Sequence, residues 1–256
     1  ERTFRHWFDR RSKARGSAPR VAYFVDTWTN HYAPQVGIAA VRLLEAAGFR
    51  VVAPDIGCCG RVLISQGLLA EARHAAQINI ERLVRFADSG TPIVGSEPSC
   101  LLTLRDEYPR LLPGEDAKAV AGASHLLEDF LDNLLREEPD RIRFSNRQRR
   151  LLYHAHCHQK ALVGSAGAVR LLGRPGGYDV VEIDSGCCGM AGSFGHMKEH
   201  YDVARAIGEQ RLFPAVRNRG EFEVAVSGFS CREQIAHHTD VAPRHLLEHL
   251  ADALEH

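Results

Sequence analysis

The tetrapeptide Gly57-Cys58-Cys59-Gly60 occurs again as Gly186-Cys187-Cys188-Gly189, 129 residues further along the chain. Two flanking segments repeat at nearly the same offset, 130 and 131 residues: Val21-Ala22-Tyr23 with Leu151-Leu152-Tyr153, and Pro98-Ser99-Cys100 with Phe229-Ser230-Cys231. An offset that barely changes over this distance indicates two copies of one supersecondary unit. The sequence therefore predicts a duplicated fold organised around the two Cys-Cys-Gly triplets.

The cysteines of the chain, seven in all, fall at corresponding positions of the two copies. The second copy has the larger set: Cys157, Cys187, Cys188 and Cys231. The first copy has Cys58, Cys59 and Cys100, because Thr27 stands where the second copy has Cys157. This asymmetry predicts that the second copy carries the more complete site.

Each copy reads as alternating strands and helices. In the first we expect strands at 21–25, 50–53 and 91–95 and helices at 34–47 and 68–86. In the second we expect strands at 151–154, 178–183 and 223–226 and helices at 167–172 and 201–216. Such alternation predicts parallel pairing through right-handed crossovers. The expected fold class is α/β, with two pseudo-symmetric lobes, each a small, open, mainly parallel sheet flanked by helices.

The expected domain limits follow from the repeat. They are a linker helix at 1–20, a first lobe at 21–135, a connector at 136–150, a second lobe at 151–253, and a segment at 254–256 that resembles a vector-derived tag remnant. The segments 117–135 and 239–254 are each expected to form one helix. The charged, aromatic start without Met leads us to expect a domain excised from a longer protein. For the Arg-rich start we favour a solvated linker helix over a docking surface for a neighbouring domain or a membrane contact.

Composition narrows the class of protein. Lys plus Arg and Asp plus Glu both number 32, so no global field favours nucleic acid. No stretch approaches the roughly 20 apolar residues of a membrane span, and no secretory signal is present. We therefore expect a cytoplasmic protein, in whose reducing surroundings cysteines serve metal binding or catalysis more often than disulfides.

The cysteines follow the predicted strands at the edge where ligands collect in open α/β sheets. Four converging thiolates suit zinc or an iron–sulfur cluster. No Cys-x-x-Cys pair is present, which disfavours structural zinc, and adjacent cysteines can reach separate irons of one cluster. Zinc and buried or redox-active thiols remain alternatives in the second copy. In the first copy the alternatives are a second cluster, a remnant of duplication and a vicinal disulfide.

Neighbouring residues suggest supporting roles. Gly60 and Gly189 suit a close backbone approach or a positive φ. His154, His156 and His158 flank Cys157, and we expect hydrogen-bonded structural histidines, with ligation or proton transfer by one of them as the alternative. His196 and His200 have the i, i+4 spacing of a metal pair on a helix, which is a weak signal here. The glycine-rich stretch 186–195 lacks the spacing of a nucleotide loop.

These residues resemble the cysteine-rich CCG-domain proteins, and most of all the C-terminal iron–sulfur part of fused FAD-linked oxidases. The motifs that carry the likeness are Phe24-Val25-Asp26-Thr27, Pro92-Ile93-Val94-Gly95, Glu97-Pro98-Ser99-Cys100 and Gly186 to Gly195. The resemblance implies an electron-transfer domain of a 2-hydroxy-acid oxidoreductase. It implies a [4Fe–4S] cluster, with a second one as a further option, and FAD on a domain outside this chain, which has no flavin site of its own. It also implies flavin and ferredoxin-like domains as partners, a membrane quinone or cytochrome as acceptor, and then a peripheral place at the inner membrane face.

The likeness to the cysteine-rich subunit of heterodisulfide reductase, a relative in this family, has a gap. That relative has a fifth cysteine three residues after the last one of each motif, and here Thr103 and Gln234 stand at those positions. This departure argues against the alternative of cluster-based thiol or disulfide reduction. A non-catalytic redox-sensing or zinc-binding module is the alternative from another class.

Overall fold

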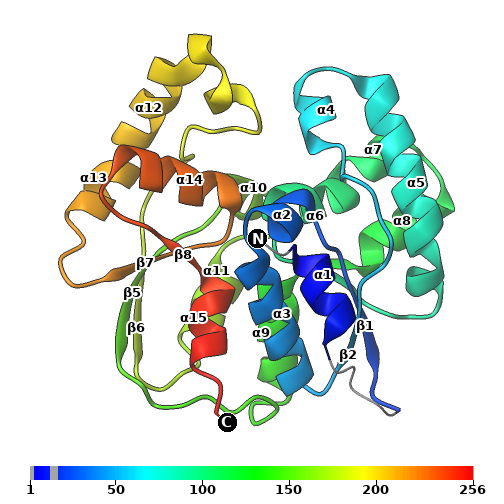
Figure 1. Cartoon of the computed structure of the whole chain (residues 1–256), viewed down its shortest axis with the longest axis horizontal. Helices are drawn as coiled ribbons and strands as arrows, with labels where there is room; N and C mark the ends of the chain where they lie inside the picture. The colour runs from blue at the N-terminus through cyan, green and yellow to red at the C-terminus, as the bar shows by residue number, and fades with distance from the viewer. Residues whose placement is uncertain (1–2, 12–16, 256) are drawn as a thin grey trace. The chain divides into compact units, whose positions relative to one another are not determined.

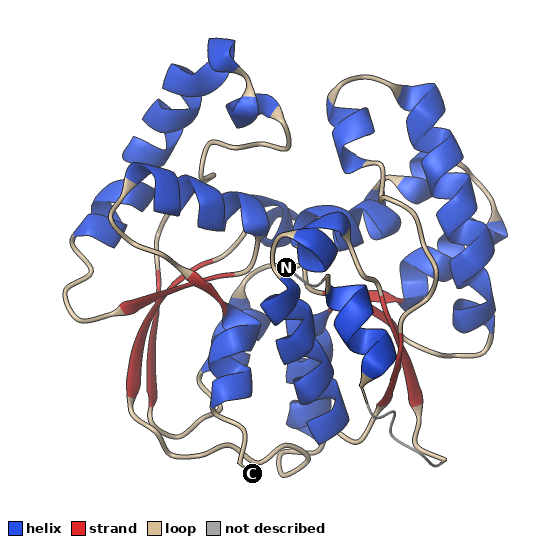
Figure 2. Ribbon diagram, in the orientation of Figure 1, coloured by secondary structure: helices blue, strands red, loops and turns tan. Residues whose placement is uncertain are grey.

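The computed structural model describes residues 3–11 and 17–255. The chain divides into two compact units, residues 1–142 and 143–256. Each unit carries a four-stranded sheet whose strands are all parallel, with helices packed around it (Figures 1 and 2). The predicted α/β class with two parallel lobes is therefore confirmed.

The first unit has the strand order β2-β1-β3-β4. Its strands are β1 (Arg20–Tyr23), β2 (Arg50–Val52), β3 (Ile93–Gly95) and β4 (Ser124–Leu126). Its helices are α1 (Phe4–Arg10), α2 (Thr27–His31), α3 (Pro34–Ala46), α4 (Arg61–Ser65), α5 (Leu69–Asp88), α6 (Pro98–Asp106), α7 (Tyr108–Leu111), α8 (Glu115–Ala123) and α9 (Leu127–Glu137).

The second unit has the corresponding order β6-β5-β7-β8. Its strands are β5 (Arg149–His154), β6 (Tyr178–Glu182), β7 (Glu223–Val226) and β8 (Arg244–His245). Its helices are α10 (Cys157–Leu162), α11 (Ala166–Leu172), α12 (Tyr201–Glu209), α13 (Leu212–Arg217), α14 (Phe229–His238) and α15 (Leu246–Asp252), with short 3-10 helices η1 (Phe194–His196) and η2 (Lys198–His200) before α12.

The repeat extends to register and to side chains. Val21 pairs with Val51 in the first sheet, and Leu151 pairs with Val180 in the second. An ion pair is duplicated as well: Arg82 contacts Asp55 in the first unit, and Arg211 contacts Asp184 in the second. The central strands β1, β3, β5 and β7 are mostly buried, as expected for parallel strands covered on both faces.

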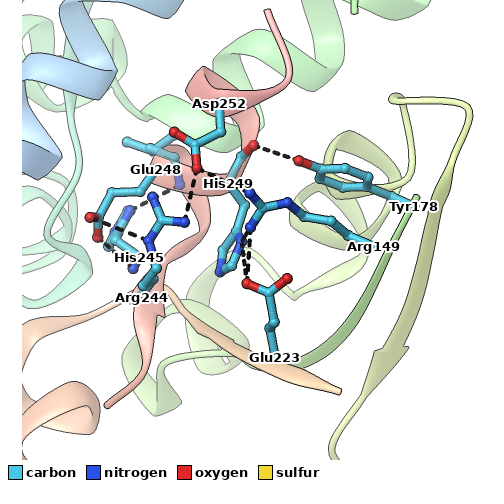
Figure 3. A network of polar contacts seen from close by, with 9 residues as sticks. Arg149, Tyr178, Glu223, Arg244, His245, Glu248, His249 and Asp252 are labelled. Atoms are coloured by element: carbon cyan, nitrogen blue, oxygen red, sulfur yellow. Dashed lines mark hydrogen bonds and ion pairs between the residues drawn. The ribbon is translucent and has the colours of Figure 1, made fainter. Parts of the chain in front are cut away.

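A polar network joins the starts of the strands to α15 in the second unit (Figure 3). Arg149, which is largely buried, contacts Glu223 at 2.9 Å and Asp252 at 3.4 Å. Arg244 contacts the same Asp252 carboxylate at 2.9 Å. These charges surround the fully buried His249 of α15, and they lie at the opposite end of the strands from the cysteines.

Several expected helix boundaries are wrong. A short parallel strand, β4, interrupts the helix expected at 117–135, and β8 takes part of the one expected at 239–254. The helix expected at 201–216 breaks into α12 and α13. In each case a strand pairing or a turn outweighs the helical periodicity.

The N-terminal prediction also needs correction. Within the predicted 1–20 segment, residues 1–2 and 12–16 lie outside the described part, and the helix found there, α1, covers Phe4–Arg10. It is solvated on one face only, because Phe4 and Phe8 are buried and the Arg5 amide donates to Asn30 Oδ1, whereas His6, Asp9 and Arg10 are exposed. At the other end Leu254 bridges to Phe144, whereas His256 lies outside the described residues.

Among the described residues, no helix is both long and apolar enough to cross a membrane.

Candidate metal centre

The cysteines lie just beyond the carboxyl ends of neighbouring parallel strands. Cys157 is the first residue of α10 after β5, Cys187 and Cys188 lie in the loop after β6, and Cys231 lies in the first turn of α14 after β7. Because these strands are adjacent and parallel, residues far apart in sequence meet at one edge of the sheet.

The four thiols of the second unit form a chain of sulfur contacts. Cys157 hydrogen-bonds to Cys187, and Cys188 lies between Cys187 and Cys231. Cys188 and Cys231 are buried, whereas Cys157 and Cys187 are partly exposed. The structure thus brings together all four residues that the sequence predicts for this site.

Along this row of sulfur contacts, the thiol pKa values are alternately raised and lowered. A hydrogen bond from Cys157 lowers the pKa of Cys187, and contact with Cys188 lowers the pKa of Cys231, where nearby His154 adds to the effect. The same contacts raise the pKa values of Cys157 and Cys188. Each contact therefore favours the thiolate at one of its two cysteines, and the thiolate is the form of cysteine that binds metals.

The loop that carries Cys187 and Cys188 is held by a tight backbone approach. The Gly189 amide lies 3.3 Å from Cys187 Sγ, and Gly189 has φ +97°. A Cβ at this glycine would lie 2.0 Å from the Ala204 carbonyl oxygen of α12. The expected positive φ is present, and the close approach is to α12 backbone. Ala191 also has a positive φ, of 42°.

Two polar side chains that sequence reasoning missed hold the same loop. Lys160 of α10 donates to the carbonyl oxygens of Ser185 and Gly186, just before Cys187. Gln234 Nε2 donates to the Cys188 carbonyl oxygen at 3.3 Å. The only sequence signal for Lys160 is its place three residues after Cys157, and Gln234 stands where the heterodisulfide reductase relative has its fifth cysteine.

The histidines around Cys157 are mainly structural. His154 Nδ1 lies 2.9 Å from Ser185 Oγ, and His156 accepts a hydrogen bond from the His158 amide as the N-cap of α10. The His154 ring borders Cys231, and its buried Nε2 has no partner of good geometry among the described residues. His154 could therefore donate a hydrogen bond to sulfur at this site.

The prediction that His196 and His200 share one helix is wrong. They lie in two separate 3-10 helices, η1 and η2, because the chain turns between them. The His200 ring instead stacks on Phe194, with centroids 4.0 Å apart.

The first unit repeats the arrangement without its fourth thiol. Cys58 contacts Cys59, and Cys59 contacts Cys100. Thr27 begins α2 as Cys157 begins α10, and its hydroxyl hydrogen-bonds to Cys58 as Cys157 does to Cys187. Thr27 therefore occupies the position of the missing ligand in space as well as in sequence.

The electrostatic surroundings of the two sites differ. In the first unit the carboxyl groups of Asp26 and Glu97 are buried close to Cys100. A hydrogen bond from Cys59 lowers the pKa of Cys100, but burial and these two carboxylates outweigh it and raise the pKa to about 11. The corresponding surroundings in the second unit hold His154 and His156, which favour a thiolate.

Asn79 fixes the first cysteine loop, a role to which no sequence pattern points. Its Oδ1 accepts from the Gly57 amide at 2.9 Å, and its Nδ2 donates to the Cys58 carbonyl oxygen at 2.9 Å. Tyr108 completes the support, since its hydroxyl donates to the Cys59 carbonyl oxygen at 3.0 Å.

The second unit has the donor chemistry of an iron–sulfur site. It offers four thiols, a backbone amide on sulfur and the buried imidazole of His154 beside Cys231. No group of three or more His, Cys, Asp or Glu in the described part of the chain has the geometry to hold a metal ion. All seven cysteines are free thiols.

Comparison with known proteins agrees with this geometry. The cysteine-rich domain family named CCG matches residues 21–105. A subunit of anaerobic glycerol-3-phosphate dehydrogenase from Escherichia coli K12 is 31% identical over 98% of this chain and 64% of its own length. Lactate utilization protein A from Geobacillus thermodenitrificans is 31% identical over 68% of this chain and 74% of its own. D-2-hydroxyglutarate dehydrogenase from Pseudomonas putida is 30% identical over 87% of this chain and 21% of its own.

The fold and its two cysteine-lined strand edges define a duplicated cysteine-rich α/β protein. The chain belongs to the CCG cysteine-rich domain family, among relatives of the FAD-linked oxidases. It spans 64% of the length of the glycerol-3-phosphate dehydrogenase subunit that it matches. The relatives are dehydrogenases, subunits of them or lactate-utilization proteins, which supports an electron-transfer role.

Proposed function

We propose that this chain is the iron–sulfur electron-transfer part of a flavin-linked oxidoreductase that oxidises a 2-hydroxy acid or a similar alcohol. The observation that carries the proposal is the meeting of Cys157, Cys187, Cys188 and Cys231 at one sheet edge. The names of the relatives, which include a D-2-hydroxyglutarate dehydrogenase and a lactate utilization protein, support this choice of substrate class.

We assign the cluster, of the [4Fe–4S] type, to these four cysteines. When bound, it supplies one-electron redox chemistry. The protein's own contribution is to fix the sulfurs and to set their surroundings. Lys160 and Gln234 hold the loop through its carbonyl oxygens, and the Gly189 amide donates to Cys187 Sγ. Hydrogen bonds to sulfur and nearby positive charge stabilise the reduced, more negative state.

The three cysteines of the first unit, Cys58, Cys59 and Cys100, are proposed as a second, incomplete binding site. Its weakness follows from the missing fourth thiol and from the buried carboxyl groups of Asp26 and Glu97, which disfavour further negative charge.

The electron path and its partners complete the proposal. Flavin and ferredoxin-like domains, in the same polypeptide or the same complex, deliver the electrons, and a quinone or another carrier accepts them. The protein then works in the cytoplasm, at the inner face of the membrane when the acceptor is a membrane quinone. The FAD belongs to a domain other than the two units described here.

Anaerobic reconstitution with iron and sulfide tests the proposal. Dithionite should bleach the visible absorption of the wild-type protein, and a soluble one-electron acceptor should restore it. Cys187→Ser should lose this reversible signal, whereas Cys58→Ser, the matched position of the first unit, should retain it. Loss in Cys58→Ser with retention in Cys187→Ser would reverse the assignment, and no signal in the wild type would refute electron transfer.

A further inference from the structure

An open cavity of about 600 Å³ lies beside Cys58 in the first unit. It is bounded by the cysteine loop, α4 and α5, which are neighbouring helices in Figure 1. Its lining residues are Gly57, Cys58, Leu63, Ala70, Glu71, His74, Ala75 and Ile78. Most of this surface is apolar, and the volume falls within the range of small-molecule sites.

The helix α4 has an apolar surface that the described chain does not cover. Val62, Leu63 and Ile64 make up most of this five-residue helix, yet none of its residues is buried. Val62, Leu68 and Leu69 are 44%, 45% and 47% exposed, and they are sequence neighbours of the lining residues Leu63 and Ala70. Exposed apolar groups gathered at a pocket are typical of ligand-binding surfaces.

The duplication supplies an internal comparison. The second unit has a cavity at the corresponding place, beside Cys187, and Ile207 lines it as Ile78 lines the first. This second cavity is smaller, about 370 Å³, and polar residues such as Asp184, Gln210 and Arg211 line it. The cavity of the first unit is therefore the larger and more apolar of the two.

The polar groups of the first cavity restrict its occupant. Glu71 and His74 lie one turn apart on α5, and both are exposed. The carboxylate repels anions, whereas an imidazole can donate to a carbonyl and a carboxylate can accept from a hydroxyl. These features fit a neutral ring with oxygen substituents.

We propose that this cavity binds a neutral, apolar carrier of the quinone class, with the ring between α4 and α5 and its oxygen groups toward Glu71 and His74. The inference rests on the proposed electron-transfer function and deepens it by giving the acceptor a site. Cys58 lines the cavity, so the ring lies next to this cysteine.

Calorimetric titration of the full chain with decylubiquinone tests this site. Every ring carbon of that quinone is substituted, so that addition of thiols to the ring is hindered. Iron-free protein is used, so that no cluster can reduce the quinone, and a thiol count before and after the titration shows that the quinone has not oxidised cysteines to disulfides. We expect one saturable site, and Ala70→Trp should weaken binding at least about tenfold by filling the cavity. Ala70 is exposed on α5, so the change should leave the fold intact.

Gln77→Trp is the matched control, because Gln77 is exposed on the same helix but does not line the cavity. It should bind the quinone like the wild type. The inference is overturned if no saturable binding occurs, if Ala70→Trp binds with wild-type affinity, or if both variants lose binding equally.

Iron content after reconstitution is a separate readout. Absence of iron with intact quinone binding would count against the proposed function, and iron without quinone binding would count against this site.

Discussion

At the residue scale, one position separates the two sites. Thr27 and Cys157 share the first helical position after the central strand, and both hydrogen-bond to the first cysteine of the adjacent pair. A hydroxyl is a poor ligand for iron in this setting, whereas a thiolate is a good one. The number of thiols at each edge therefore follows from this one exchange.

Thr27→Cys should complete the first site. Because Thr27 already contacts Cys58, the new thiol needs no backbone movement to reach the others. We expect the iron content of reconstituted protein to rise toward twice that of the wild type, measured by metal analysis with acid-labile sulfide. Asn30→Cys, on the same helix, serves as the control and should add nothing. An unchanged iron content in Thr27→Cys would show that the buried carboxyl groups, not the missing ligand, limit this site.

The sequence was sufficient for the cysteines but not for the residues that hold them. An offset between repeats identifies corresponding cysteines, and parallel strand topology then predicts that they meet. Lys160 and Asn79 hold the loops by donating hydrogen bonds to backbone carbonyl oxygens. Other side chains with a donor at a suitable distance can make the same bonds, so no sequence motif identifies these residues. The sequence likewise does not predict that the carboxyl groups of Asp26 and Glu97 are buried.

At the element scale, the two cysteine loops differ in how closely a helix approaches them. Gly60 and Gly189 both have positive φ, 83° and 97°. A Cβ at Gly60 would meet Ala75 at an ordinary 3.5 Å, whereas at Gly189 it would collide with the Ala204 carbonyl oxygen. The loop at Gly189 therefore tolerates a side chain less well than the loop at Gly60.

Alanine substitutions at the two glycines should differ in cost. Gly60→Ala carries the conformational strain alone, about 1–2 kcal/mol. Gly189→Ala adds displacement of α12 and should cost about 3 kcal/mol or more. Urea unfolding followed by circular dichroism measures both. Equal midpoints for the two variants would contradict the close approach of α12.

The short strands β4 and β8 are the elements that the sequence did not predict. Each has two or three residues followed directly by a helix, and both belong to segments with helical periodicity. Pairing with β3 and β7 fixes them as strands, and this long-range interaction has no local signature. Central strands and long helices, by contrast, were predictable because burial extends over more residues.

His249 of α15 should make stability depend on pH. Burial and the nearby Arg244 and Arg149 lower its pKa to about 3, although the Asp252 carboxylate opposes them. The other charged or titratable neighbours are Glu223 and His245. Below about pH 6.5, the unfolded chain binds a proton that the folded chain refuses until about pH 3. Stability from this group is therefore complete above pH 6.5 and is lost as the pH falls toward 3, at about 1.4 kcal/mol per unit of pKa difference.

His249→Leu should remove this dependence. The free energy of unfolding in urea should fall less between pH 7.5 and pH 5 in the variant than in the wild type. His6→Gln, at an exposed position of α1, should keep the wild-type slope. The same slope in His249→Leu would mean that this histidine is protonated in the folded protein.

At the scale of the whole molecule, duplication followed by divergence explains the arrangement. Both units keep the strand order, the register and the Asp–Arg ion pair, while the thiols and the cavity linings have changed. We propose that the two lobes expected at 21–135 and 151–253 are functionally distinct. The second holds the redox centre, and the first offers the acceptor site.

Iron and acid-labile sulfide content, measured together with EPR on protein reconstituted without oxygen, tests the central claim most directly. We predict about four irons and four sulfides per wild-type chain, with the EPR signal of a reduced cluster. Cys187→Ser should lose them, and Cys58→Ser should keep them. A wild-type chain that binds neither iron nor sulfide, or a Cys187→Ser variant with full content, would contradict the assignment of the cluster to the second unit.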